Sequence, residues 1–179
     1  KILQQSYPDT RQRDKAKLFV EKGNLFLQLK NTDSSLSNFK QGLQYFQFSG
    51  SAFYPDYTVT ALYFGLAKSL KLQNAGSSLY YYQLGMENDY YTNQLVSTSV
   101  NSLQNNAVID EGMNHEAINA FYQQYKLTGK EDYLQKQLWL MELSKGRKLL
   151  NEVNRTKQWA TDSSMQQTEQ LFRELRYDY

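Results

Sequence analysis

Apolar side chains recur along most of the chain at the three- and four-residue spacing of α-helices. In residues 36–46 they stand at i, i+3, i+7 and i+10, as Leu36, Phe39, Leu43 and Phe46. This spacing gathers apolar residues on one face of a helix. No stretch rich in Val, Ile and Thr alternates with polar residues as a half-buried strand would. We therefore expect an all-α chain.

The pattern of residues 27–43 is written a second time, 43 residues further on. The matched positions are Leu27/Leu70, Leu29/Leu72, Asn31/Asn74, Ser34/Ser77, Ser35/Ser78, Leu36/Leu79, Phe39/Tyr82, Gly42/Gly85 and Leu43/Met86. Self-similarity at a fixed period of about 20–50 residues is typical of arrays of stacked helical units. The sequence thus predicts a solenoid of helix pairs.

Glycine stands at the same place in both copies, as Gly42 and Gly85. Glycine inside a helix costs about 1 kcal/mol relative to alanine. A repeated glycine therefore indicates close approach of a second helix, which a side chain would block.

The pattern divides the chain into helices and short breaks. Helices are expected at 11–30, 33–49, 56–73, 76–88, 90–105, 114–128, 131–154 and 163–179. Residues 106–113 are expected to form a connector broken at Gly112, and Gly129 to stop a helix. Both prolines, Pro8 and Pro55, stand just before the first helix of a repeat, so they separate units.

We group these elements into one helical-repeat domain, 1–179. Its parts are the end of an earlier helix (1–10), repeat 1 (11–49), repeat 2 (54–88), an extra helix and connector (89–113), a third helix pair (114–155) and a C-terminal helix (162–179). The chain opens as if in mid-helix, so we expect a fragment of a longer protein. The sequence does not fix its compartment; we favour the cytoplasm.

Charge is unevenly distributed, although the net charge is only +2. Residues 1–71 hold ten basic and five acidic side chains, and residues 72–125 hold five acidic and no basic ones. This asymmetry could orient a charged partner, or it could be incidental variation on solvated faces. No run reaches the roughly 20 apolar residues of a membrane span.

Few residues suit catalysis or metal binding. His115-Glu116 begins like a zinc-protease motif, but Asn119 occupies the place of the second histidine. The chain has no cysteine and no other histidine, so we expect no metal, no cofactor and no enzyme activity, with His115 exposed in the first turn of its helix. The basic run 145–148 would spread around a helix, so we expect no nucleic-acid partner.

Tyrosines are densest at 80–82 and 90–91. Tyr82 should pack inside, as the counterpart of Phe39, while Tyr80 or Tyr81 should be exposed. Exposed rings could form a partner hot spot or a platform for a sugar. Packing between repeats is the simpler interpretation.

The alternation of large and small residues resembles the tetratricopeptide repeat (TPR). Its large and small places are taken in turn by Phe19, Gly23, Phe26, Ser35, Phe39 and Gly42. In the second copy Gly23 aligns with Leu66, which lies between Gly65 and Ala67, so the first helix could slip by one residue. The resemblance implies a right-handed α-α superhelix.

Residues 119–134 and 141–150 resemble the last helical pair before the protease-like domain of CHAT proteins, in which a caspase-like domain follows TPR repeats. Residues 166–171 resemble the helix that follows in that family. The resemblance implies cysteine-peptidase chemistry in a separate domain. None of that chemistry transfers here, because the chain has no cysteine.

We therefore expect a non-catalytic TPR scaffold that binds a protein or peptide along its concave face and regulates, or recruits to, a caspase-like domain outside this chain. The expected groove-lining residues are Lys17, Asn24, Gln28, Tyr63 and Lys71. Asn24 lacks the lysine one turn earlier that the carboxylate clamp of this family needs, since Val20 stands there.

Two other functions stay open. One is a glycan-binding TPR-like protein of a nutrient-uptake system, which the aromatic content favours. The other is a self-assembly module, a homo-oligomer whose terminal helices pack on a copy of themselves.

Overall fold

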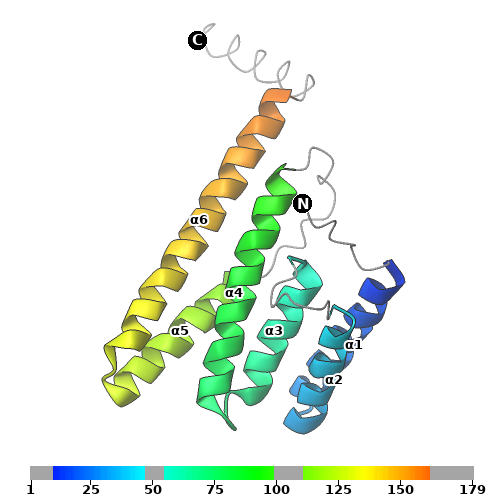
Figure 1. The fold of residues 1–179 in the computed structure, drawn as a ribbon, viewed down its shortest axis with the longest axis vertical. Helices are drawn as coiled ribbons and strands as arrows, with labels where there is room; N and C mark the ends of the chain where they lie inside the picture. The colour runs from blue at the N-terminus through cyan, green and yellow to red at the C-terminus, as the bar shows by residue number, and fades with distance from the viewer. Residues whose placement is uncertain (1–9, 47–54, 99–110, 162–179) are drawn as a thin grey trace, which may run out of the picture.

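The computed structural model describes residues 10–46, 55–98 and 111–161. These residues form six α-helices and no strand, so the expectation of an all-α chain is confirmed. The helices are α1 (Thr10–Gln28), α2 (Thr32–Gln44), α3 (Tyr57–Leu70), α4 (Ala75–Thr98), α5 (Glu111–Thr128) and α6 (Glu131–Thr161). Figure 1 shows α1 to α4 side by side, with α5 and α6 forming a hairpin at the other end and α6 extending past α4.

The repeated asparagine begins the second helix of each pair. Asn31 Oδ1 accepts a hydrogen bond from the backbone N–H of Ser34 at 3.1 Å, and Asn74 Oδ1 accepts one from Ser77 at 2.9 Å. A side-chain acceptor at this place satisfies a free N–H group of the first helical turn. The two copies thus start α2 and α4 with the same contact, 43 residues apart.

The register of the first helices differs by one residue. Ser35 Oγ donates to the Gly23 carbonyl at 3.0 Å, and its counterpart Ser78 donates to the Ala67 carbonyl at 2.8 Å. Ala67 lies 44 residues after Gly23, so α3 is shifted by one residue against the period of α2 and α4. The sequence alone left this choice open.

Close helix packing at the glycines is confirmed. The fully buried Phe39 ring of α2 lies between Gly23 of α1 and Gly65 of α3. A Cβ on Gly23 would lie 2.5 Å from that ring, and one on Gly65 closer still. Gly42 faces Leu62 of α3, and Gly85 faces Phe64 of α3.

Helix α4 runs without interruption through the predicted break at residue 89, so the division into 76–88 and 90–105 is wrong. The polar residues at this point of the helix are buried: Asn88 is 0% exposed and Asp89 is 2% exposed. Asn88 Oδ1 accepts hydrogen bonds from the backbone N–H of Asp56 at 3.3 Å and from Thr60 Oγ1 at 2.9 Å. Because α3 supplies these partners, the helix continues with polar side chains inside.

Other boundaries also differ from the expectation. Helix α5 begins at Glu111, so Gly112 lies in its first turn and is not a break, and α6 continues past residue 154 to Thr161. The predicted stop at Gly129 is confirmed, with φ of 67° after the last residue of α5. The expected elements at 1–9, 47–49, 99–110 and 163–179 lie outside the described residues.

The buried side chains form two clusters, one around Phe39 and Leu62 and a second one that holds the α5–α6 hairpin against α3 and α4. Phe64 of α3 and Tyr82 of α4 share this cluster with Phe121 of α5 and Leu140 of α6. Further along, a Cβ on Gly146 of α6 would lie 3.5 Å from the Tyr90 ring of α4. Helix α6 thus packs along α4.

Candidate functional site

Three of the predicted binding residues share one exposed face of α1. Lys17, Asn24 and Gln28 are seven and four residues apart, which places them in one row along the helix. The row lies about 100° around the helix from the buried face marked by Ala16 and Gly23. All three side chains are exposed.

Tyr63 lies elsewhere. It is 8% exposed, and its ring stacks on Tyr81 of α4 with 6.2 Å between centroids. Burial raises its pKa above the ordinary value, with smaller contributions from Tyr80 and Tyr81. Since α3 packs between α2 and α4, Tyr63 belongs to the core, and its expected place on an exposed groove is corrected.

Lys71 and Lys68 share a single carboxylate. Glu116 of α5 lies 3.2 Å from Lys68 Nζ and 3.5 Å from Lys71 Nζ. The hydroxyl group of Tyr82, a fully buried residue of α4, donates to Glu116 Oε1 at 2.9 Å. These contacts join α3, α4 and α5. Two lysines face one carboxylate, so one positive charge remains unneutralised in this group.

Sequence reasoning missed Lys68 and Glu116. Lys68 is the 44-residue counterpart of Asn24, so it occupies in α3 the place that Asn24 occupies in α1. The strict 43-residue alignment hides this equivalence. Nothing in the sequence pairs Glu116 with Lys68, because the two residues are 48 positions apart.

The site fixes the charge of Glu116 and keeps Tyr82 neutral. Burial by itself would raise the pKa of Glu116, but the Lys68 charge, the hydrogen bonds from Tyr82 and Lys68, and the Lys71 charge together lower it below the usual 4.5. The pKa of Tyr82 is raised by burial, by the Glu116 charge and by their hydrogen bond. Glu116 is therefore ionised, and Tyr82 is a donor, at neutral pH.

We expect Glu116→Gln to destabilise the protein by about 0.5–1 kcal/mol at pH 7, because both ion pairs are partly exposed and screened. A carboxyl whose folded pKa is lowered stabilises the fold above its unfolded pKa, and this contribution is lost as the pH falls through the folded pKa. The difference between wild type and variant should therefore shrink below about pH 4.5. Urea unfolding at pH 7 and pH 3 measures it.

Glu142→Gln is the matched control, since among the described residues Glu142 pairs with Lys145 alone, on the same exposed helix face, at 2.8 Å. It should change stability little at either pH. A Glu116→Gln effect of equal size at both pH values would contradict the role assigned to the ion pairs.

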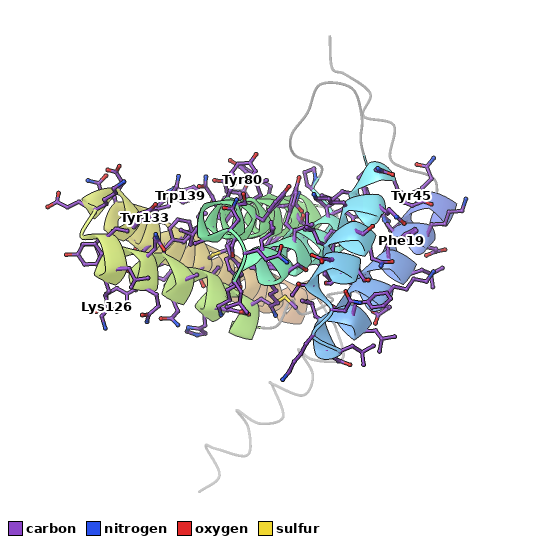
Figure 2. All side chains as sticks on the ribbon, turned by 90° about the horizontal axis from the view of Figure 1, so that it is seen from below. Phe19, Tyr45, Tyr80, Lys126, Tyr133 and Trp139 are labelled. Atoms are coloured by element: carbon purple, nitrogen blue, oxygen red, sulfur yellow. The ribbon has the colours of Figure 1, made fainter. Side chains whose placement is uncertain are left out.

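Aromatic rings gather on another side of the molecule. Tyr80 is 56% exposed and Trp139 of α6 is 39% exposed. Figure 2 shows Tyr80 and Trp139 along the same side of the molecule. Lys136 Nζ lies 5.0 Å from the Trp139 ring centroid. The expected burial of Tyr82, with Tyr80 exposed, is confirmed.

Other candidate chemistry is sparse in the part of the chain that the structure describes. No group of three or more His, Cys, Asp and Glu residues there could hold a metal ion, and no helix there is long and apolar enough to cross a membrane. His115 is exposed, as expected, but it lies in the second turn of α5, because the helix begins at Glu111. In the basic run, Lys145 is paired with Glu142.

The chain was also compared with known proteins. No family model matches it, and no curated protein or solved structure is significantly similar to it. The resemblances to the TPR repeat and to the CHAT proteins therefore rest on the residues named above, and the candidate site rests on its own geometry.

Proposed function

We propose that the chain is a non-catalytic, TPR-like helical-repeat scaffold that binds a protein or peptide segment along the face formed by α1 and α3. The observation that carries this proposal is the exposed polar row of α1, which one polar residue at an equivalent place on α3 extends. Asn24 of α1 and its counterpart Lys68 of α3 occupy equivalent places, and both lie outside the tightly packed core. Lys17 and Gln28 extend the row on α1, and Lys71 continues it past α3.

Direct contacts hold α1 and α3 together and fix the face that they form. α1 and α3 contact each other directly, and Arg13 Nη2 of α1 lies 2.7 Å from the Asp56 carboxylate at the start of α3. Phe39 fills the space between them from the α2 side.

The lysines of this face offer positive charge to carboxylates of a partner, beside the exposed Asp14 and Glu21 on the neighbouring stripe of α1. Lys17 is exposed and has no ion pair among the described residues, and Lys68 and Lys71 share one carboxylate. An acidic segment would gain charge-assisted hydrogen bonds there, with the amides of Asn24 and Gln28 as further donors. In a longer parent, this scaffold would regulate, or recruit a partner to, a caspase-like domain, as the CHAT resemblance implies.

Peptides selected from a random display library on the wild-type chain test the proposal. We expect selected peptides to be rich in Asp and Glu, and Lys17→Ala combined with Asn24→Ala to weaken their binding about tenfold, which corresponds to about 1.4 kcal/mol. The melting temperature should stay nearly unchanged, because both side chains are exposed. Isothermal calorimetry and thermal melts measure the two quantities.

Lys40→Ala with Gln44→Ala is the control, since both side chains are exposed on α2. It should leave binding intact. Equal affinity of both double variants would exclude the α1 face. If no peptide binds and oligosaccharides quench the fluorescence of the two tryptophans, Trp139 and Trp159, the glycan alternative would lead, with Tyr80 and Trp139 as its platform.

A further inference from the structure

A row of leucines on α1 points directly away from the core. Leu18, Leu25 and Leu29 are 62%, 54% and 65% exposed. At 100° per residue they lie within about 20° of one line, opposite to the buried Ala16 and Gly23. We call these three residues the leucine row. Isolated exposed leucines are ordinary, but three aligned on one helix face form an apolar stripe.

Opposite charges flank the leucine row. Asp14 and Glu21 lie along one side of it, and Lys15 and Lys22 lie along the other. All four side chains are exposed, and none has an ion pair within the described residues. Lys22 rests near the Phe19 ring, with Nζ 5.5 Å from its centroid. The face thus has an apolar centre, an acidic edge and a basic edge.

This charge arrangement selects one way for two such faces to meet. When two parallel helices are related by a two-fold axis along their length, the acidic edge of each meets the basic edge of the other. Glu21 would then lie beside Lys22 of the second copy, and Asp14 beside Lys15. In an antiparallel pair, edges of the same sign would meet, placing Lys22 against Lys22 and Glu21 against Glu21, which is repulsive.

We propose that the leucine row of α1 is a homodimer interface, in which a second copy of this chain packs its own α1 in parallel. The observations that carry this are the exposed row and its self-complementary charges. The contact is small beside the roughly 1,200–2,000 Å² of stable interfaces, so the dimer is weak and reversible. The row of Lys17, Asn24 and Gln28 lies on another part of α1, so the proposal does not depend on the proposed peptide binding.

Sedimentation equilibrium of the chain over about 5–500 µM tests it, a range chosen because weak interfaces dissociate at micromolar concentrations. We expect the fraction of dimer to rise with concentration and to fall in high salt. Leu25→Glu should raise the dissociation constant at least about tenfold. Leu72→Glu and Leu127→Glu are controls, since these leucines are 92% and 80% exposed outside α1 and should not change it.

Disulfide trapping fixes the orientation, because the chain has no cysteine of its own. Leu18→Cys alone should form a disulfide-linked dimer under mild oxidation, since a parallel pair places residue 18 beside itself. A dimer that forms only when Leu18→Cys is mixed with Leu29→Cys would show an antiparallel pair and overturn the proposal. A monomer throughout the concentration range, or dimerisation unchanged by Leu25→Glu, would overturn it as well.

Discussion

Gly65→Ala should destabilise the protein by about 2–3 kcal/mol, although alanine is the better helix former. The new methyl group would enter the space of the Phe39 ring. That ring cannot withdraw, because Gly23 of α1 contacts it from the other side, where a Cβ would lie 2.5 Å away. Relief therefore requires α1, α2 or α3 to shift. The melting temperature should fall by about 5–10 °C.

Two comparisons make this test specific. Gly76→Ala replaces a helical glycine that has open space around it, with only Asn74 Oδ1 at 3.6 Å, so it should be neutral or stabilising by up to about 1 kcal/mol. In a Phe39→Leu background, Gly65→Ala should cost much less, because the smaller side chain leaves room. Equal costs in both backgrounds would show that the Phe39 contact is not the cause.

Asn88→Ala should cost about 2–4 kcal/mol, because it removes a fully buried amide that other groups depend on. The Asp56 N–H and the Thr60 hydroxyl donate to Asn88 Oδ1, and Thr92 Oγ1 lies 3.4 Å from the same atom. Without the amide oxygen, the Asp56 N–H loses its acceptor, the Thr60 hydroxyl keeps only the Asp56 carbonyl at 3.3 Å, and a cavity remains. Chemical denaturation at pH 7 measures the loss.

Asn38→Ala is the matched control for this change. Asn38 is also a helical asparagine, but within the described part of the chain its amide donates to the Ser34 carbonyl of its own helix alone, at 2.8 Å. Its replacement should change the free energy of unfolding by less than about 0.5 kcal/mol. If Asn88→Ala and Asn38→Ala lowered the free energy of unfolding equally, the buried hydrogen bonds between α3 and α4 would not explain the cost of Asn88→Ala.

The local features of the fold were predictable from the sequence. Apolar spacing predicted the helices, and the repeated glycines predicted the close helix contacts. Each depends on residues a few positions apart, or on the comparison of two copies. The exposed row of Lys17, Asn24 and Gln28 followed in the same way, because spacing within one helix determines which residues share a face.

Features that depend on contacts between residues distant in sequence were decided only by the tertiary structure. The sequence predicted a break at residue 89, yet Asp56 and Thr60 accommodate the buried Asn88 inside a continuous α4. Tyr63 is buried because helices pack on both sides of α3. The spacing of apolar residues does not show whether a helix is covered on one side or on two. The pairing of Glu116 with Lys68 and Tyr82, and the one-residue shift of α3, likewise arise from contacts that only the packed helices bring together.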